Sequence, residues 1–141
     1  MLSQADMDRL IEQHIAAEVA GNSAAAVAMY TDDVEHDVVG WPTGPVSGPG
    51  AAKDFYDALM ATFVNEEMVP TRQLYGGAFC VVEHRAAGRF PVGFMGAPPS
   101  DQQVVFRMLH VFEFSEDGIS RENVWLDGGA IVGQLLAAAT S

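Results

Sequence analysis

The sequence predicts an α+β domain in which helices pack on one face of a curved antiparallel sheet. Apolar residues recur at helical spacing up to Phe63, whereas segments rich in β-branched and aromatic residues dominate from residue 71 onward. Helices followed by strands are the element order typical of α+β domains. The chain has 141 residues, of which 49% are hydrophobic. We therefore expect a single domain over residues 1–141, large enough to enclose a pocket.

The N-terminal part is expected to form two helices. Ser3, followed three residues later by an acid, is a typical helix start. An apolar stripe at helical spacing continues this helix, and His14 lies on the stripe. Asn22 or Ser23 would cap a second, alanine-rich helix that ends near residues 32–33.

A strand and a third helix are expected next. The β-branched residues at positions 34–39 predict a strand, and the glycine- and proline-rich segment 40–45 predicts a loop. Ser-Gly-Pro-Gly at 47–50 would open a helix whose apolar residues, up to Phe63, form a broad buried face.

The C-terminal half is expected to be mainly β-structure. Strands are predicted at 71–75 and 79–89, and an exposed connection at 93–99. A short helix over 130–138 would close the chain, with Asp127 near its N-terminus.

The stretch from Gln102 to Asp127 predicts a β-hairpin with a tight turn at 116–118, because Asp-Gly accepts the backbone geometry of hairpin turns. Facing Ser115 with Ile119 places two pairs of opposite charges directly across from each other. The resulting pairs are Arg107–Asp127, Leu109–Trp125, Val111–Asn123 and Glu113–Arg121.

The other face of this hairpin is apolar except for His110 and Glu122, which lie diagonally across the strand pair. Because an unpaired buried carboxylate is costly, Glu122 is expected to be protonated, paired or near a rim. This face is the place where the residues alone predict chemistry. In contrast, Arg107 and Asp127 are expected to be structural, and His84 to have a solvated or interface role.

The net charge of −12 disfavours nucleic acid and anionic membranes as partners, since both bind positive charge. Cys80 is alone, so no internal disulfide is possible. The sequence has no leader pattern or bilayer-length apolar stretch, and we expect a cytoplasmic protein. It has no phosphate loop, no clustered Cys/His ligands and no serine-nucleophile motif, and it predicts neither a metal site nor a cofactor.

The order of elements resembles the cone-shaped NTF2-like superfamily, specifically its SnoaL-like polyketide cyclase and ketosteroid isomerase branches. The resemblance covers essentially the whole chain, and its motifs specify the fold better than the reaction. It implies a cone with an internal pocket, formed by three N-terminal helices packed on a strongly curved antiparallel sheet. The residues that carry it are HIAAEVAGN at 14–22, YTDD…HDVVG at 30–40, SGPGAAKDFY at 47–56, GFMGAPPS at 93–100 and FRMLHVFEF…DGI at 106–119.

The resemblance also implies site residues. His14 stands where the isomerases have a tyrosine donor, Asp37 stands at their general base, and His110 stands at their second oxyanion donor. The acid/base aspartate of the cyclases falls at or beside Val124, so Glu122 or Asp127 would have to replace it.

The choice between His36 and Asp37 stays open at this stage. The two residues have opposite strand parity, so regular pleating points only one of them inward. A bulge near Gly40 would decide which one it is. The resemblance favours Asp37, with His36 as the substitute.

These residues predict cofactor-independent acid–base catalysis on a small, mostly apolar ligand, of polyketide, steroid or terpenoid type. Asp37 or Glu122 would remove a proton next to a carbonyl, and His110 and His14 would stabilise the enolate. Two alternatives are an epoxide hydrolase of the limonene type and a non-catalytic ligand-binding or association domain. The expected substrate-binding wall consists of Trp41, Met60, Phe94, Met108, Phe112 and Val124.

The outer face of the hairpin predicts an interface. Leu109, Val111 and Trp125 place a large aromatic and two aliphatic side chains on a face that is otherwise expected to be solvated. The superfamily resemblance implies a homodimer through this face.

Overall fold

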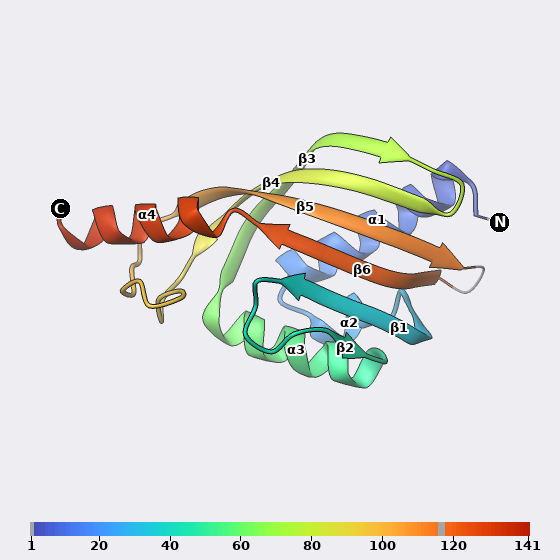
Figure 1. Cartoon of the computed structure of the whole chain (residues 1–141), viewed down its shortest axis with the longest axis horizontal. Coiled ribbons are helices and arrows are strands. Elements are labelled where there is room, and N and C mark those ends of the chain that lie inside the picture. The colour runs from blue at the N-terminus through green and yellow to red at the C-terminus, as the bar shows by residue number, and fades with distance from the viewer. Residues whose placement is uncertain (1, 116–117) are drawn as a thin grey trace.

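The helices of the protein cover one face of a curved sheet, as the computed structural model in Figure 1 shows for the described residues 2–115 and 118–141. The α+β prediction is confirmed. The elements in chain order are α1 (Gln4–Val19), α2 (Ser23–Val27), β1 (Tyr30–Val39), β2 (Val46–Ser47), α3 (Pro49–Thr62), β3 (Val64–Tyr75), β4 (Phe79–Arg89), β5 (Val104–Ser115), β6 (Gly118–Leu126) and α4 (Gly128–Ala139).

The strands of the sheet lie in the order β2-β1-β6-β5-β4-β3. Neighbouring strands from β3 to β6 are antiparallel, but β1 runs parallel to β6, so the sheet is mixed and not purely antiparallel. The reason is the connection. The chain reverses direction between consecutive strands from β3 to β6, through the long segment 90–103 between β4 and β5, whereas β1 reaches β6 from a remote part of the chain.

The predicted register of the β5–β6 hairpin is confirmed along most of its length. Leu109 pairs with Trp125 and Glu113 with Arg121. The register shifts after Glu113, so Ser115 pairs with Gly118 and not with Ile119. The predicted turn includes residues 116–117, which lie outside the described residues.

The N-terminal helices begin where the sequence indicates. Ser3 caps α1, and its hydroxyl accepts a hydrogen bond from the Asp6 backbone while the Asp6 carboxylate accepts one from Ser3. Asn22 caps α2, but this helix ends at Val27 and β1 begins at Tyr30, earlier than predicted. The buried pairing of Tyr30 with Ile119 outweighs the helix propensity of the alanine-rich segment.

Two strands extend beyond the predictions. Strand β3 begins at Val64 and not after Pro70, and a short β2 lies in the segment before α3. Asp127 caps α4 through its side chain, as its predicted structural role requires. The Arg107 side chain pairs with Glu83 (Nη2–Oε2 2.7 Å), although its carbonyl oxygen accepts a hydrogen bond from the Asp127 backbone.

The hydrophobic core lies between the concave face of the sheet and the helices. One cluster joins α1, α2 and α3 to the sheet, and a second joins α4 to β4, β5 and the connection before β5. Within the described ranges, no helix combines the length and apolar character needed to cross a membrane. The space between the two clusters is where a pocket forms.

Candidate active site

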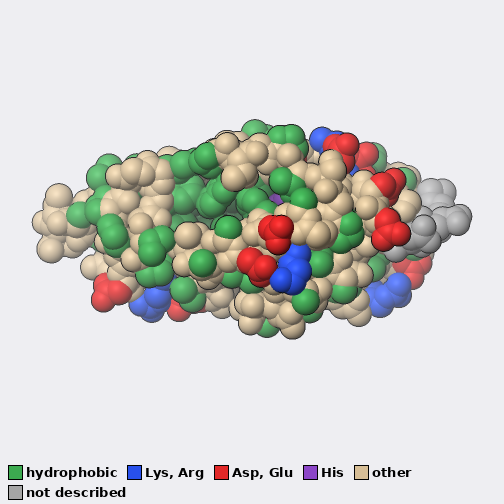
Figure 2. All heavy atoms as spheres, turned by 90° about the horizontal axis from the view of Figure 1, so that it is seen from below, with side chains coloured by type: hydrophobic (Ala, Val, Ile, Leu, Met, Phe, Trp, Pro, Cys, Tyr) green, Lys and Arg blue, Asp and Glu red, His purple; other side chains and the backbone are tan. Residues whose placement is uncertain are grey.

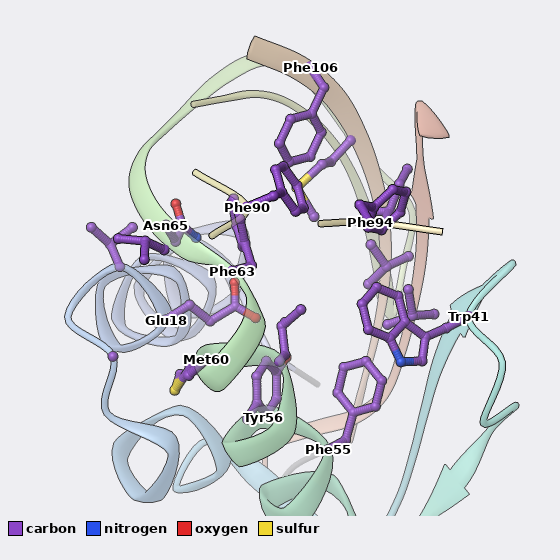
Figure 3. Close-up of a pocket in the computed structure, with 18 of the residues that line it drawn as sticks. Glu18, Trp41, Phe55, Tyr56, Met60, Phe63, Asn65, Phe90, Phe94 and Phe106 are labelled. Carbon is purple, nitrogen blue, oxygen red and sulfur yellow. The ribbon is translucent and has the colours of Figure 1, made fainter. Parts of the chain in front are cut away.

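A cavity of about 270 Å³ opens between α1, α3 and the concave face of the sheet. Figure 2 shows a hollow in the molecular surface that is surrounded by hydrophobic side chains, with a histidine side chain visible inside it. The close-up in Figure 3 shows Phe55 and Tyr56 entering from α3, Trp41 from the segment after β1, and Glu18 from α1. The wall is mainly aromatic and aliphatic, as expected for a small-molecule site.

Most of the predicted wall residues line this cavity: Trp41, Met60, Phe94, Met108 and Val124. Phe112 does not line it. Phe112 points inward as predicted, but it lies deeper, in the core, with its ring 5.3 Å from that of His110 and nearly parallel to it. Strand alternation gives the face of a side chain but not how far along the cone the cavity reaches.

His36, and not Asp37, points into the cavity. His36 is 2% exposed and lines the cavity wall, between the buried residues Val34 and Val38. Asp37 lies on the opposite face of the sheet, where its carboxylate accepts a hydrogen bond from the Asn123 amide at 3.2 Å. The register irregularity of β1 falls between Tyr30 and Glu35, so no bulge near Gly40 turns Asp37 inward. The expected placement of Asp37 is therefore wrong.

Beneath the cavity floor, His14 and Glu122 form a buried ion pair. Neither side chain is exposed, and His14 Nε2 lies 3.1 Å from Glu122 Oε2. Burial lowers the pKa of His14, but the charges of Glu122 and Glu18 outweigh it and hold this pKa well above its ordinary value. Burial raises the pKa of Glu122, but His14, followed by His36 and His110, brings it below its ordinary value. Of the three expectations for Glu122, the paired one is correct.

The orientation of His14 follows from its other nitrogen. Nδ1 lies 2.8 Å from the Ala26 carbonyl oxygen, which can only accept, so Nδ1 carries a proton and donates. The Nε2 atom is thereby aimed at the polar cluster between the helices and the sheet. The first helix and its alanine-rich neighbour thus fix the direction of one functional ring.

Two tyrosines complete this cluster, and the sequence analysis did not single them out. The Tyr30 hydroxyl donates to Glu122 Oε2, and the Tyr56 hydroxyl lies 3.3 Å from the same atom. The Tyr56 hydroxyl is also 3.1 Å from His14 Nε2 and 3.2 Å from His36 Nε2. Burial and then the Glu122 charge raise the pKa of Tyr56 well above its ordinary value, so it stays a neutral donor. In the sequence, both tyrosines look like ordinary core aromatics.

Glu18 was also missed. It follows His14 by one helical turn, its carboxylate points toward the cavity in Figure 3, and its Oε1 lies 3.4 Å from His14 Nε2. The i,i+4 spacing of a histidine and an acid on the apolar stripe was the available signal.

His110 lies on the inner face of the sheet, as the hairpin pattern predicts. His84, on β4, does not lie where it was expected. His110 lines the cavity, is 1% exposed, and places Nε2 3.6 Å from Glu122 Oε1. His84 is equally buried, and its Nδ1 lies 3.3 Å from Nδ1 of His110. The expected solvated or interface role of His84 is therefore wrong. Strand β4 turns this residue toward the helices, where an isolated strand segment gave no preferred face.

Three side chains of the cluster have donor atoms close enough to hold a divalent cation, namely His14, Glu18 and Glu122. His14 Nε2 and Glu122 Oε2 are already engaged with each other and with the Tyr56 hydroxyl. Two of these donor atoms are therefore already hydrogen-bonded to protein groups, and we build no chemistry on a metal.

The geometry supplies the parts of an acid–base site. His36 and Tyr56 lie side by side at one end of an apolar cavity, with His110 and Glu18 also on its wall. Burial lowers the pKa of His36 below its ordinary value, although Glu122 and Glu18 act in the opposite direction. A neutral imidazole is thus available as a proton acceptor next to a neutral phenol donor.

A family model described as SnoaL-like domain matches residues 11–122. No curated protein matches the sequence. Several solved structures share the fold. One is a candidate polyketide cyclase from Xanthomonas campestris pv. campestris, with a TM-score of 0.76 and 20% identity, covering 92% of this chain and 96% of that chain.

Two further structures have other names. An epoxide hydrolase from M. tuberculosis, described as LEH-like, has a TM-score of 0.71 and 19% identity, covering 94% of this chain and 90% of its own. A candidate isomerase from Bacillus subtilis has a TM-score of 0.77 and 10% identity, covering 98% of this chain and 97% of its own. At these identities the likeness extends to the fold and not to the reaction.

Proposed function

The chain belongs to the SnoaL-like domain family, and we propose that its pocket catalyses cofactor-independent acid–base chemistry on a small, mostly apolar ketone. The observation that carries this proposal is the pair formed by the Tyr56 hydroxyl and His36 Nε2, 3.2 Å apart at one end of an apolar cavity. A donor and an acceptor at this separation match a carbonyl oxygen and the C–H group next to it.

The Tyr56 hydroxyl has one proton to donate and several neighbours. In the free protein, the Tyr56 oxygen accepts from His14 Nε2–H at 3.1 Å, and its single proton is shared between Glu122 Oε2 at 3.3 Å and His36 Nε2 at 3.2 Å. When a substrate carbonyl binds, this proton turns to the carbonyl oxygen, and the lone pair of His36 Nε2 is released. The bound ketone would therefore activate the base that attacks it.

In the proposed reaction, His36 Nε2 takes the proton from the carbon next to the carbonyl. The C–H electron pair forms a carbon–carbon double bond, and the carbonyl π electrons move to oxygen to give an enolate. Tyr56 and His110 stabilise this oxygen as hydrogen-bond donors. The enolate then either takes the proton back from His36 at another carbon, which is an isomerisation, or attacks a second carbonyl in the same molecule. In that cyclisation, the resulting alkoxide takes the proton from His36.

The surroundings favour this chemistry. The cavity wall is mainly aromatic and aliphatic, and an apolar lining strengthens each hydrogen bond to a developing charge. The Tyr56 oxygen accepts from His14 Nε2 of the buried ion pair, which orients the hydroxyl and leaves its proton for the carbonyl. A ligand with an apolar ring or chain and one or two ketone groups fits this division between a polar end and an apolar wall.

The limonene-type epoxide hydrolase alternative is less well supported. It requires an arginine between two carboxylates around one water molecule. Among the described residues that line the cavity there is no arginine or lysine, and Glu18 is the one carboxylate. The non-catalytic alternative requires at most one polar group, whereas His36, Tyr56 and His110 all reach this cavity.

The proposal is tested by hydrogen–deuterium exchange, which reports proton abstraction whatever the final product. A panel of unsaturated ketones and linear diketones is incubated with the protein in D₂O, and exchange next to the carbonyl is followed by NMR. We expect His36→Asn to slow the exchange by about 10²–10⁴-fold and Tyr56→Phe by about 10²–10³-fold. Asp37→Asn, on the opposite face of the sheet, is the matched control and should exchange at the wild-type rate. Wild-type rates in His36→Asn, or no exchange above buffer with any ketone, would contradict the proposal.

A further inference from the structure

His84 and His110 share a hydrogen bond that links their protonation. Their Nδ1 atoms lie 3.3 Å apart, their rings are nearly perpendicular at 86°, and both side chains are buried. A hydrogen bond between two ring nitrogens needs one N–H and one lone pair. One ring must therefore carry its proton on Nδ1 and the other must leave its Nδ1 bare.

The far side of His110 decides which ring donates. His110 Nε2 faces Glu122 Oε1 at 3.6 Å. Oε1 is buried and has no hydrogen-bond partner among the described residues. A bare Nε2 would place a lone pair against this carboxylate oxygen, whereas an Nε2–H group is attracted to it. The second arrangement is favoured, so His110 carries its proton on Nε2 and its Nδ1 is the acceptor.

The charge state of His110 agrees with this assignment. Burial lowers the pKa of His110 below its ordinary value, although Glu122 and Glu18 act in the opposite direction. The neutral His110 ring carries a single N–H proton, which lies either on Nδ1 or on Nε2. The stacked Phe112 ring, at 5.3 Å and 2° between planes, also holds the plane of His110 fixed. Only the position of this proton is then left to be set: Glu122 Oε1 attracts it to Nε2, and the Nδ1–H group of His84 occupies the lone pair on His110 Nδ1 and keeps the proton there.

We infer that His84 is a positioning residue whose Nδ1–H group holds His110 in the Nε2–H form, with this N–H group presented to the cavity and to Glu122 Oε1. His110 is thereby restricted to the role of donor, which leaves His36 as the proton acceptor. The catalytic consequence rests on the proposed function, but the protonation pattern itself does not.

The pattern is measured by NMR in the free protein labelled with ¹⁵N-histidine, because protonated and bare ring nitrogens have well-separated shifts. Signals are assigned with His84→Asn and His110→Asn. We expect a protonated Nε2 and a bare Nδ1 on His110 at neutral pH, with a protonated Nδ1 on His84. A protonated Nδ1 on His110 would overturn the inference.

Three variants separate positioning from packing. His84→Leu should shift His110 toward a mixture of the two forms and lower kcat by about tenfold or more, as other orienting partners of histidines do. His84→Asn, whose amide nitrogen can occupy the place of Nδ1, should restore both. Val82→Ala removes buried volume from the same strand and should leave the His110 form unchanged. An unchanged His110 signal in His84→Leu would contradict the inference. If no activity is found in any variant, the proposed function fails, while the NMR pattern still decides the role of His84.

Discussion

His14 Nε2 and Glu122 Oε2 lie 3.1 Å apart between the helices and the sheet, and neither side chain is exposed to solvent. Each charge removed from water is costly, and hydrogen bonds from neighbouring groups offset part of this cost. The Ala26 carbonyl accepts from His14 Nδ1, and the Tyr30 hydroxyl donates to Glu122. This pair anchors α1 to β6, and the cavity floor rests on it.

We expect removal of one member of this pair to cost more stability than removal of both. His14→Leu leaves the Glu122 carboxylate buried without a cation and should lower the free energy of unfolding by about 3–5 kcal/mol. The double variant His14→Leu/Glu122→Leu should recover a clear part of this loss. Urea denaturation of the wild type, both single variants and the double variant gives the coupling energy. Additive losses would show that the pair is not coupled.

Acidification should destabilise the protein between about pH 6.5 and 4 through its buried neutral histidines. Burial, and then the His110 charge, lowers the pKa of His84 from 6.5 to about 4. The unfolded chain therefore binds a proton in this window that the folded protein does not, so the free energy of unfolding falls as the pH falls. His14 acts oppositely: its pKa is raised, so its contribution is fully present below pH 6.5 and is lost only at higher pH.

The measurement is urea denaturation at several pH values across this window. His84→Leu should reduce the slope of unfolding free energy against pH, because one of the titrating groups is removed. A slope equal to that of the wild type would assign the acid sensitivity to other groups.

The proposed activity should persist below the pH at which an ordinary histidine is protonated. Because burial lowers the pKa of His36, its imidazole stays neutral and able to accept a proton below pH 6.5. We expect exchange rates to be constant from neutral pH to below 6.5 and then to fall with one protonation. A fall that begins above pH 6.5 would argue against His36 as the base.

The outer face of the hairpin should hold two copies of the chain together. Trp125 is 41% exposed and pairs across the strands with Leu109, which is 37% exposed. A charge placed at the centre of such an apolar face would be buried unpaired in a dimer. Trp125→Glu should therefore give monomers in sedimentation velocity. Leu136→Glu, on an exposed position of α4, is the control and should leave the oligomeric state unchanged. A Trp125→Glu protein that sediments like the wild type would place the interface elsewhere.

The elements of the fold could be predicted because their signals are local. The capping residues of α1 and α2, the strand β4 and most of the β5–β6 register follow from spacing and charge within a few residues. The early start of β1 and the long β3 could not be predicted in the same way. The start of β1 pairs with β6, far along the chain, and the first half of β3 pairs with the far end of β4, with Val64 opposite Arg89. This pairing overrides local preference.

The residues of the candidate site also differ in whether local sequence signals could place them. Alternation within one hairpin was sufficient to place His110 and Glu122 on a shared inner face. Alternation within an isolated strand could not decide whether His36 or Asp37 faces the cavity, and it could not orient His84. Either face of such a strand can be the buried one.

The sequence by itself determined the α+β class, the family resemblance and one polar pair on an apolar face. Only the tertiary structure decided that Tyr30 and Tyr56 meet Glu122, that His36 faces the cavity, and that His84 reaches His110. The physical reason is that a buried polar group needs partners, and these partners come from α1, β1, α3, β4, β5 and β6, which become neighbours only when the sheet curves around the helices.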